Sequence, residues 1–446
     1  MKETELMEPA ATGPWPSPDE TAKLRERYIL PLPGPMYSKP LQIVKGRMQY
    51  VFDETGRRYL DAFAGVATVS IGHSHPHFVR KLSEQIGEYL HNPALYLHPS
   101  LPRYAERLIA KLKTANPALE ACFFTNSGSE ANELAALIAK NFTGSHEFVA
   151  MRHSYHGRTL MAMALTGQAN WRHSMPYVYG VSFAPANYVY RKPDSMDARQ
   201  FTQWCVGELE DAINASTSGK IAGFYAEPIN GVGGVITPEP EYFPGAYEAI
   251  KRHGGLFIAD EVQTGLGRTG RKFLGIEQWG VKPDIVTMAK GLGNGYPIGA
   301  VVTTREIAAA VKGKLHYNTF GGSPAQMAAA SAVLDVFDSE NLSENAHQVG
   351  GYLLGALGKL AERSGCIGEV RGKGLMIGLE LVKDKKSKEP APELALKILD
   401  ACKERGVLIG KGGMAGNVLR VKPPLCITRQ DADAVVAALS ESIAGL

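Results

Sequence analysis

The sequence predicts an α/β protein whose main sheet is mostly parallel and flanked by helices, followed by a smaller α+β part. Three observations carry this prediction. Short apolar runs alternate with amphipathic helical segments from about residue 70 to about residue 330, a pattern typical of strand–helix–strand units. Polar residues directly follow several of these runs, at strand ends where α/β proteins bind ligands. Beyond residue 330 come long helical segments, a strand pair and a final amphipathic helix.

The N-terminal part predicts an arm and a hairpin. Eight of the 27 prolines fall within the first 40 residues, which predicts an irregular arm because proline lacks the N–H donor of regular structure. A strand region follows in "MQYVFDETGRRYLDAFAG". Its polar stretch Asp53–Gly56 predicts a hairpin turn.

The central part supplies the strands and helices of the main sheet. Strands are predicted in "ACFFT", "EFVAM", "IAGFYAE", "GLFIADEV", "DIVTMAK" and "GAVVTT". Helices are predicted in "LPRYAERLIAKLK", "SEANELAALIAKNF" and "YFPGAYEAIKRH". The later segments "AQMAAASAVLDVF", "ENAHQVGGYLLGALGKLAE" and "RQDADAVVAALSESIAGL" predict longer helices, and "GEVRGKGLMIGLELV" predicts a strand pair. The charged stretch "KDKKSKEPAPE" predicts an exposed loop.

Composition excludes several classes of protein. A net charge of +3 over 446 residues is too balanced to indicate nucleic acid or a membrane surface as the main partner. No apolar stretch reaches the ~18 residues of a transmembrane helix. The start "MKETELMEPAATG" resembles neither a secretory signal nor a transit peptide. The five cysteines are scattered without a C-x-x-C pair. We therefore expect a cytoplasmic protein with reduced thiols.

The stretch "TNSGSEANELAALIAK" predicts a phosphate site. Ser127 and Glu130 have the spacing of a helix capping box. Ser127, Gly128 and Ser129 would then lie at a helix N-terminus directly after a strand, where N–H groups, the helix dipole and two hydroxyls favour an anion. A well-capped helix without a ligand is the alternative for this segment alone.

The stretch "GLFIADEVQTGLGRTG" places Asp260 at the end of an apolar strand. A buried carboxylate needs a cationic or donor partner, which a ligand could supply; a carboxylate that caps a local turn is the alternative. Gly265, Gly267 and Gly270 match G-x-G-x-x-G. We reject a dinucleotide site, because the residues after Gly270 do not predict a helix and no acidic residue follows at the required distance.

Lys290 follows the apolar run of "PDIVTMAKGLGNGYPIGA", 30 residues after Asp260. A lysine in a partly desolvated cleft has a lowered pKa, and its neutral amine attacks carbonyl groups to give a Schiff base. The glycines that follow leave room for a flat ring; a lysine that reaches solvent from a strand end is the alternative. A phosphate cradle, a strand-end carboxylate and a strand-end lysine together fit one ligand, pyridoxal 5'-phosphate (PLP).

At these residues the chain resembles the class III aminotransferases, which have the PLP fold type I. The resemblance rests on "LFIADEVQTGLGRTG", "PDIVTMAKGLGNGYPIGA", "TNSGSEAN", "HSYHGRT" and "GHSHP", and runs from about residue 40 to the end. It implies a large PLP-binding domain over residues 71–330. Residues 1–70 (the arm and first strands) and residues 331–446 would form a smaller α+β domain from the two chain ends. His73 and His75 of "GHSHP" are too few to argue a metal site.

The resemblance also implies roles for individual residues. Lys290 would form the internal aldimine and move the proton, and Asp260 would pair with the ring nitrogen. Gln263 would donate to the 3'-oxygen of the ring. Val262 and Tyr155 would pack against its two faces.

The remaining implied residues surround the phosphate and the ring. Ser127, Gly128 and Ser129 would bind phosphate, His156 of "SYHG" would belong to the cofactor site, and Glu227 of "AEPINGVGG" would be an acid close by. Thr319 of "NTFGG" resembles a residue that reaches the phosphate of the neighbouring subunit. This implies a homodimer with shared sites.

Arg420 of "LRVKPPLCIT" resembles the arginine that binds the substrate carboxylate, which suits its bidentate fork. Enzymes of the 4-aminobutyrate and ornithine type carry a glutamate five residues after the equivalent of Glu227, and it covers that arginine in one half-reaction. Here Val232 occupies this position. Small substrates such as alanine, β-alanine, pyruvate and glyoxylate are therefore favoured over glutamate and 2-oxoglutarate.

Within the family the chain most resembles the alanine–glyoxylate aminotransferases, on "VATVSIGHSHP", "NTFGGSP", "RGKGLMIGLELV", "GVLIGKGG" and "PPLCIT". The expected reaction is ping-pong transamination between an amino acid (alanine, β-alanine or another ω-amino acid) and a small 2-oxo acid. A 1,2-aminomutase, a decarboxylating transaminase and a glutamate-using ω-aminotransferase remain alternatives on the same site. A cofactor-binding regulator without turnover is the alternative from another class, and no DNA-binding helix pair or basic stripe favours it.

Overall fold

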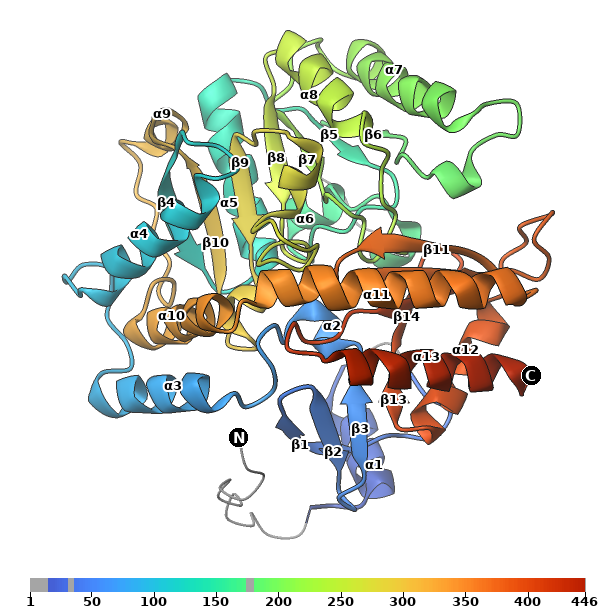
Figure 1. Ribbon diagram of the computed structural model, residues 1–446. Helices are drawn as coiled ribbons and strands as arrows, with labels where there is room; N and C mark the ends of the chain where they lie inside the picture. Colours follow the sequence, from blue (N-terminus) through green and yellow to red (C-terminus); the bar gives the residue numbers. More distant parts are fainter. Residues whose placement is uncertain (1–14, 31–35, 174–179, 446) are drawn as a thin grey trace.

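The computed structural model describes residues 15–30, 36–173 and 180–445. A seven-stranded sheet in the order β4-β10-β9-β8-β7-β5-β6 forms the centre of the large domain (Figure 1). Only β10 runs against the other strands. The strands are β4 (Leu119–Thr125), β5 (Phe148–Met151), β6 (Val181–Ala184), β7 (Gly223–Ala226), β8 (Leu256–Asp260), β9 (Ile285–Met288) and β10 (Gly299–Thr304). This arrangement confirms the predicted α/β class.

Both faces of this sheet are covered, because neighbouring residues of the central strands belong to different cores. On β7 and β8, Phe224 and Phe257 pack in one core, while Tyr225 and Ile258 pack in the other. Successive side chains of a strand point to opposite faces, so a run without polar residues indicates burial on both. The covering helices include α4 (Ser100–Leu112), α5 (Gly128–Thr143), α6 (Leu160–Ala164), α7 (Ala198–Ser216), α8 (Tyr242–Arg252), α9 (Arg305–Ala308) and α10 (Pro324–Ser339).

The two chain ends meet in two smaller sheets. The first contains β1 (Ile43–Arg47), β2 (Tyr50–Asp53), β3 (Arg58–Asp61) and β13 (Val407–Leu408), and the second β11 (Ile367–Lys373), β12 (Met376–Leu381), β14 (Gly410–Gly412) and β15 (Val418–Val421). Val407 of β13 pairs with Leu60 of β3, which confirms a smaller α+β part drawn from both ends. The domain boundaries at residues 70 and 330 stay predictions.

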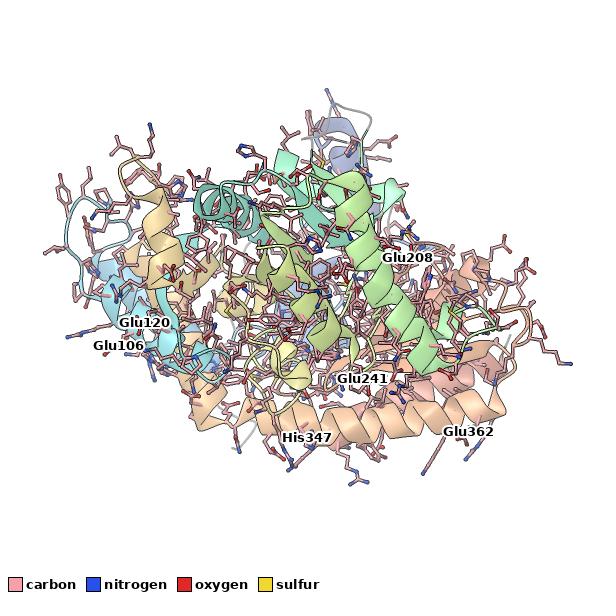
Figure 2. The ribbon with its side chains drawn as sticks, turned by 90° about the horizontal axis from the view of Figure 1, so that it is seen from above. Glu106, Glu120, Glu208, Glu241, His347 and Glu362 are labelled. Carbon is pink, nitrogen blue, oxygen red and sulfur yellow. The ribbon has the colours of Figure 1, made fainter. Side chains whose placement is uncertain are left out.

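Three helices accompany the two small sheets: α11 (Leu342–Arg363), α12 (Pro392–Glu404) and α13 (Arg429–Ala444). Charged residues occupy their outward faces, as they do on the large domain. Figure 2 shows this for Glu106 of α4 and for Glu362 of α11, both of which are exposed. Among the residues described, no helix is both long and apolar enough to cross a membrane.

The structure corrects the prediction of an irregular arm. Pro18–Tyr28 form the helix α1, whereas residues 1–14 and 31–35 of the predicted arm lie outside the described part. The Ser17 side chain caps this helix by accepting from Glu20 N at 3.2 Å. Pro18 stands in the first turn, where its missing N–H costs nothing. Counting prolines as breakers therefore missed a helix start.

Other elements also escaped the sequence patterns, among them α2 (Ala64–Ala67), α3 (Pro76–Glu88), α7 and β6. The predicted hairpin is present: β2 and β3 are antiparallel, and Gly56 adopts φ +86° in the turn between them. After Gly270 the next element is a short 3₁₀ helix, η3 (Gly275–Trp279), so the glycine-rich loop does not open an α-helix as a dinucleotide site would.

Candidate active site

The carboxyl ends of five strands surround one cavity of about 280 Å³. The segments after β4, β5, β7, β8 and β9 all line it, because parallel strands end at the same edge of a sheet. Ten predicted cofactor residues lie around this cavity: Ser127, Gly128, Ser129, Tyr155, His156, Glu227, Asp260, Val262, Gln263 and Lys290. Thr319 and Arg420 are not among the lining residues.

One end of the cavity is the N-terminus of α5. Ser127 Oγ accepts from Glu130 N at 3.2 Å, and Ser129 Oγ accepts from Arg158 N at 3.0 Å. Because each hydroxyl oxygen already accepts a main-chain N–H, its own hydrogen is free to donate. Glu130 turns back to Asn126 N at 2.7 Å rather than to the Ser127 N–H, so the predicted capping box is only half formed. Two hydroxyl donors and the helix dipole remain available for an anion.

Glycine is required at two positions of this end. A Cβ on Gly128 would lie 2.9 Å from Val262 Cγ2, so only glycine lets the helix start approach the β8 segment this closely. Gly157 has φ +137°, and a Cβ there would lie 2.3 Å from Ser129 Oγ. The two glycines hold the serine hydroxyls and the Val262 side chain around the same space.

Asp260 forms the floor of the cavity. Its Oδ2 lies 2.7 Å from His156 Nδ1 and accepts from Asn132 Nδ2 at 2.8 Å. Its Oδ1 accepts from Val262 N at 3.1 Å. Thr287 Oγ1 donates to Asn132 Oδ1 at 2.7 Å, which fixes the asparagine amide in the orientation that faces Asp260. These hydrogen bonds fix the buried Asp260 carboxylate in a position where it can pair with a cationic group of a ligand.

Lys290 comes two residues after the end of β9, the strand next to that of Asp260, and lines the same cavity. Its backbone has φ +48°, an uncommon conformation for a residue with a side chain. Burial lowers the pKa of the Lys290 ammonium to about 8, although Asp260 and Glu227 act in the opposite direction. A fraction of neutral amine is therefore present near neutral pH.

Glu227 follows β7 directly and is a buried residue of the cavity lining. It accepts from Tyr155 N at 2.8 Å and from Gly231 N at 2.9 Å. Burial raises the pKa of its carboxyl to about 7. The Tyr155 ring stands edge-on to Trp171, with ring centroids 5.0 Å apart. The Glu227 carboxylate thus fixes the backbone that carries Tyr155.

Arg420 lies in β15 behind the cavity, and no described carboxylate forms an ion pair with it. Its Nη1 donates to Gly231 O at 3.3 Å, its guanidinium stands 5.2 Å from the centre of the Phe63 ring, and its buried Nε has no partner among the described residues. Burial lowers its pKa to about 10. The main chain of Val232 lies beside it, since a Cβ on Gly412 would meet both Arg420 Nε and Val232 O.

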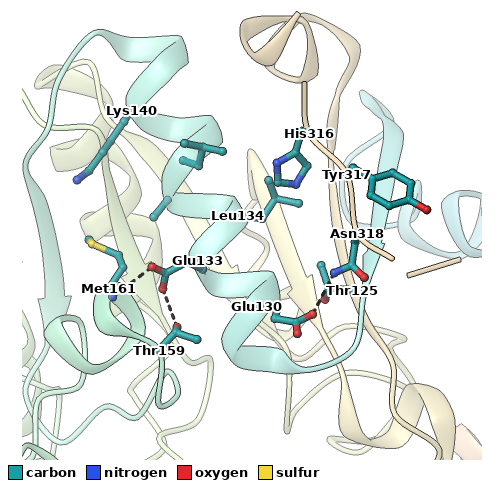
Figure 3. A pocket seen from close by; sticks show the side chains of 12 residues that line it. Thr125, Glu130, Glu133, Leu134, Lys140, Thr159, Met161, His316, Tyr317 and Asn318 are labelled. Atoms are coloured by element: carbon teal, nitrogen blue, oxygen red, sulfur yellow. Dashed lines mark hydrogen bonds between the residues drawn. The ribbon is translucent and has the colours of Figure 1, made fainter. Parts of the chain in front are cut away.

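Thr319 is exposed and lies beside a different cavity. Its neighbour Asn318 donates to Glu130 at 3.2 Å and accepts from Asn126 Nδ2 at 3.1 Å. Figure 3 shows Asn318 with His316 and Tyr317 across from α5, around a cavity of about 420 Å³. This second cavity contains none of the predicted site residues.

Several site residues escaped the sequence analysis. Asn132 and Lys422 contact predicted residues, and Thr68, Asn126 and Tyr296 line the cavity. Asn132 carried one local signal, because it lies five residues after Ser127 on the otherwise apolar face of the predicted helix. Lys422 carried none, since its partner Gln263 is 159 residues away.

The histidines of "GHSHP" bind separate carboxylates. His73 Nε2 lies 2.8 Å from Asp61 Oδ2, and His75 Nε2 lies 3.0 Å from Glu340 Oε1. No cluster of three or more metal-ligating side chains occurs in the described ranges.

The groups around the first cavity fit PLP. Hydroxyl donors at a helix N-terminus suit its phosphate, and the buried Asp260 carboxylate suits a protonated ring nitrogen. A lysine of lowered pKa suits its aldehyde.

Comparisons with known proteins agree with this chemistry. The sequence matches the family Aminotransferase class-III over residues 35–443. It is 48% identical over 435 residues to alanine–glyoxylate aminotransferase 2 homolog 2, mitochondrial, of Arabidopsis thaliana. This match covers 98% of this chain and 89% of that protein. It is 39% identical over 434 residues to alanine–glyoxylate aminotransferase 2, mitochondrial, of Homo sapiens, with 93% and 84% covered.

A solved structure is similar over nearly the whole chain. It is an amine transaminase from an uncultivated Pseudomonas species in the PLP-bound (internal aldimine) form, with a TM-score of 0.88, 34% identity, and 94% of this chain and 98% of that chain covered. These similarities confirm the predicted fold type, enzyme class and cofactor. They contradict the prediction of a cytoplasmic protein, because the curated relatives are named mitochondrial. That prediction was wrong, since it rested on the absence of a recognisable transit pattern. The chain belongs to the class III aminotransferases and is a PLP-dependent enzyme of transamination.

Proposed function

We propose that Lys290 binds the PLP aldehyde covalently, that Asp260 holds the ring nitrogen protonated, and that Gln263 donates its amide to the 3'-oxygen. The observation that carries this proposal is the position of Asp260 at the end of β8 and of Lys290 just beyond the neighbouring strand β9, around the cavity that also contains the α5 N-terminus. Bound PLP supplies an electron sink for the substrate carbon.

The chain's own residues bind the cofactor, hold it in orientation and transfer protons. Ser127 and Ser129 donate to the phosphate, and Val262 and Tyr155 pack against the ring. His156 and Asn132 hold Asp260 in its orientation. The amine of Lys290, with its pKa lowered to about 8, takes up and returns the substrate proton near neutral pH. Glu227 fixes the Tyr155 backbone.

Arg420 binds the substrate carboxylate in both half-reactions. Burying a guanidinium without an anionic partner costs free energy, so a substrate carboxylate that pairs with it binds favourably. Val232 offers no acid to cover it. We therefore propose alanine, β-alanine or another ω-amino acid as donor and pyruvate or glyoxylate as acceptor, in a ping-pong reaction. The names of the alanine–glyoxylate relatives support this substrate class.

The active enzyme is a homodimer with sites shared across its interface. Thr319 is exposed, and the side chains of Leu315, Tyr317 and Phe320 around it are exposed as well. Large apolar side chains in one segment are typical of a protein–protein contact. Asn318 ties this segment to Asn126, which lines the cofactor cavity of the same chain. A two-fold contact through this segment would bring the two cavities together, and Thr319 would then reach the phosphate of the neighbouring copy.

A donor panel tests the proposed substrates. Holoenzyme is mixed with L-alanine, β-alanine, L-glutamate and a simple primary amine, and loss of the visible absorbance band is followed, with product analysis after addition of pyruvate, glyoxylate or 2-oxoglutarate. We expect fast reaction with alanine or β-alanine and with the small 2-oxo acids. A preference for glutamate and 2-oxoglutarate would overturn the substrate proposal. Release of CO₂, or amino-group migration within one substrate, would overturn simple transamination.

A further inference from the structure

A second buried lysine lies next to the site. Lys422 follows β15 directly, its side chain is fully buried, and its main-chain N–H donates to Ala62 O at 2.8 Å. Its Nζ donates to Gln263 Oε1 at 2.9 Å and to Gly231 O at 3.4 Å. These are its only hydrogen-bond acceptors among the described residues. A lysine is rarely buried without a carboxylate, so its position calls for a reason.

The contact fixes the orientation of the Gln263 amide. A glutamine has an acceptor oxygen and a donor nitrogen, and the group that faces one of them decides where the other points. Lys422 Nζ faces two carbonyl oxygens and donates to both. Gln263 therefore presents Oε1 to the lysine, and its Nε2 donor is turned away from it.

The backbone on the other side of the amide leaves little freedom. A Cβ on Gly231 would lie 2.5 Å from Gln263 Nε2 and 2.6 Å from Oε1, so the amide rests directly against this glycine. Gly231 N in turn donates to Glu227 at 2.9 Å, which holds the loop in place. Gln263 is thus enclosed between Lys422 and a fixed backbone, with its side chain at the wall of the cavity.

We propose that Lys422 is a positioning residue, which holds the Gln263 amide so that its Nε2–H group faces the 3'-oxygen of the cofactor. This inference rests on the proposed role of Gln263. Lys422 does not touch the cavity itself; it acts through the amide. The alternative is a direct charge effect, in which the Lys422 ammonium would act on the cofactor through space and without Gln263.

The surroundings favour the hydrogen bond over the charge. Lys422 lies near three other cations, Arg420, Lys290 and Arg268, with Glu227 as the acid that faces the group. Burial and these cations lower the pKa of Lys422, so its charged form is disfavoured. A neutral amine still donates to Gln263, so the positioning effect survives loss of the charge.

The test uses the visible absorbance of the holoenzyme as a function of pH. An N–H donor at the 3'-oxygen draws negative charge from that oxygen and weakens its hold on a nearby proton. Loss of the donor should raise the pH midpoint of the visible band. For Lys422→Met we expect a rise of about 0.5–1 pH unit, the scale of one hydrogen bond. Lys422→Ser, which is too short to reach Gln263 and leaves room for water, should shift the midpoint in the same direction.

A double-mutant cycle separates the two readings. Gln263→Met alone should raise the midpoint, and adding Lys422→Met to it should produce no further change. Lys403→Met is the matched control, because Lys403 is a buried lysine of α12 that contacts Glu404 and the Tyr37 ring away from the cavity. It should leave the midpoint unchanged.

Each outcome decides the question. An unshifted midpoint in a folded Lys422 variant, or a full shift that persists beside Gln263→Met, overturns the positioning role. The proposed cofactor chemistry fails separately: a wild-type protein loaded with PLP but without a covalent, pH-sensitive band would sink it. Lys422 variants that match the wild-type band leave that chemistry standing and refute only the role of Lys422.

Discussion

His156 and Asp260 form a buried pair at the floor of the cavity, with His156 Nδ1 only 2.7 Å from Asp260 Oδ2. The carboxylate can only accept, so Nδ1 carries the hydrogen. Asn132 of α5 donates to the same oxygen. The carboxylate is therefore held by neighbours on two segments before any ligand binds, which is the preorganisation that electrostatic stabilisation requires.

Replacing Asp260 should remove most of the activity. In Asp260→Asn the residue loses its charge and no longer keeps the ring nitrogen protonated. We expect kcat for alanine to fall by about 100-fold or more, the scale of losing one preorganised electrostatic group. Asp335→Asn is the control, since Asp335 pairs with His77 at 2.9 Å outside the cavity. Near wild-type kcat in Asp260→Asn would assign the ring nitrogen to another partner.

Lys290 should be the only point of covalent attachment of the cofactor. Borohydride reduction of the holoenzyme should add the mass of the reduced cofactor to the peptide that contains Lys290. Lys290→Ala should lose this attachment and turnover, yet retain PLP after gel filtration, because the phosphate contacts proposed for Ser127 and Ser129 do not depend on the lysine. Lys403→Ala should behave as wild type. Attachment to a different peptide, or turnover of Lys290→Ala above a few per cent, would contradict the assignment.

The parts of the site that could be predicted from sequence are those encoded within one segment. Ser127 caps the helix that follows it, and Lys290 comes shortly after the end of an apolar strand, so a local pattern reveals both. Asn132 and Lys422 could not be predicted in this way. They contact Asp260 and Gln263 across 128 and 159 residues of chain. Only the folded sheet brings those segments together.

The same limit explains the errors in the fold. The patterns predicted the strands of the large sheet other than β6, because burial on both faces makes those strands continuously apolar. They missed β6, an edge strand that is only partly buried. They missed β13, whose two residues become a strand only by pairing with β3. They also missed α1, which has no buried side chain and therefore little apolar periodicity. Its start depends on the Ser17 cap instead.

Glu227 should make the apoprotein less stable as the pH rises. Burial raises its pKa from 4.5 to about 7, so between these values the folded state binds more protons than the unfolded state. The free energy of unfolding then falls with pH. The loss amounts to about 3 kcal/mol across this window at most.

Glu227→Gln should abolish this contribution. We expect the difference in unfolding free energy between wild type and variant to change by a few kcal/mol from about pH 4.5 to about pH 7, in the direction that disfavours wild type at higher pH. Denaturant titrations of both apoproteins at several pH values give the difference. Glu261, raised to about 7 by the same cause, remains in both proteins and cancels. A difference that is flat with pH would mean that Glu227 keeps an ordinary pKa.

Thr319 should affect the affinity for PLP although it does not line the cofactor cavity of its own chain. Thr319→Ala removes one hydroxyl donor from the proposed phosphate site of the partner copy. We expect the dissociation constant for PLP to rise by about 5- to 10-fold, the scale of a hydrogen bond to a charged group. Thr114→Ala, which changes an exposed threonine whose hydroxyl donates to Lys111 O within its own helix end, is the control. An unchanged constant, or a holoenzyme that sediments as a monomer, would refute the shared site.

Arg420 should select substrates by their carboxylate. Removing the buried guanidinium in Arg420→Ala costs carboxylate substrates about 1.5–3 kcal/mol of binding, so KM for alanine and pyruvate should rise about 10-fold or more. A simple primary amine has no carboxylate and should be affected far less. Arg405→Ala is the control, since its guanidinium binds Glu441 at the surface. Steady-state kinetics with both donors measure the contrast.

The neighbour of Arg420 provides the reciprocal change. Val232→Glu places an acid beside a guanidinium that has no carboxylate partner among the described residues, and the new carboxylate should compete with alanine for it. We expect weaker use of alanine and unchanged or better use of an amine without a carboxylate. The informative quantity is the ratio of kcat/KM for alanine to kcat/KM for the simple amine. It should be highest in wild type and fall in both Arg420→Ala and Val232→Glu. An equal ratio in all three proteins would mean that the carboxylate binds elsewhere. The substrate class would then have to be argued from another cation, whereas the proposed roles of Asp260 and Lys290 would be unaffected.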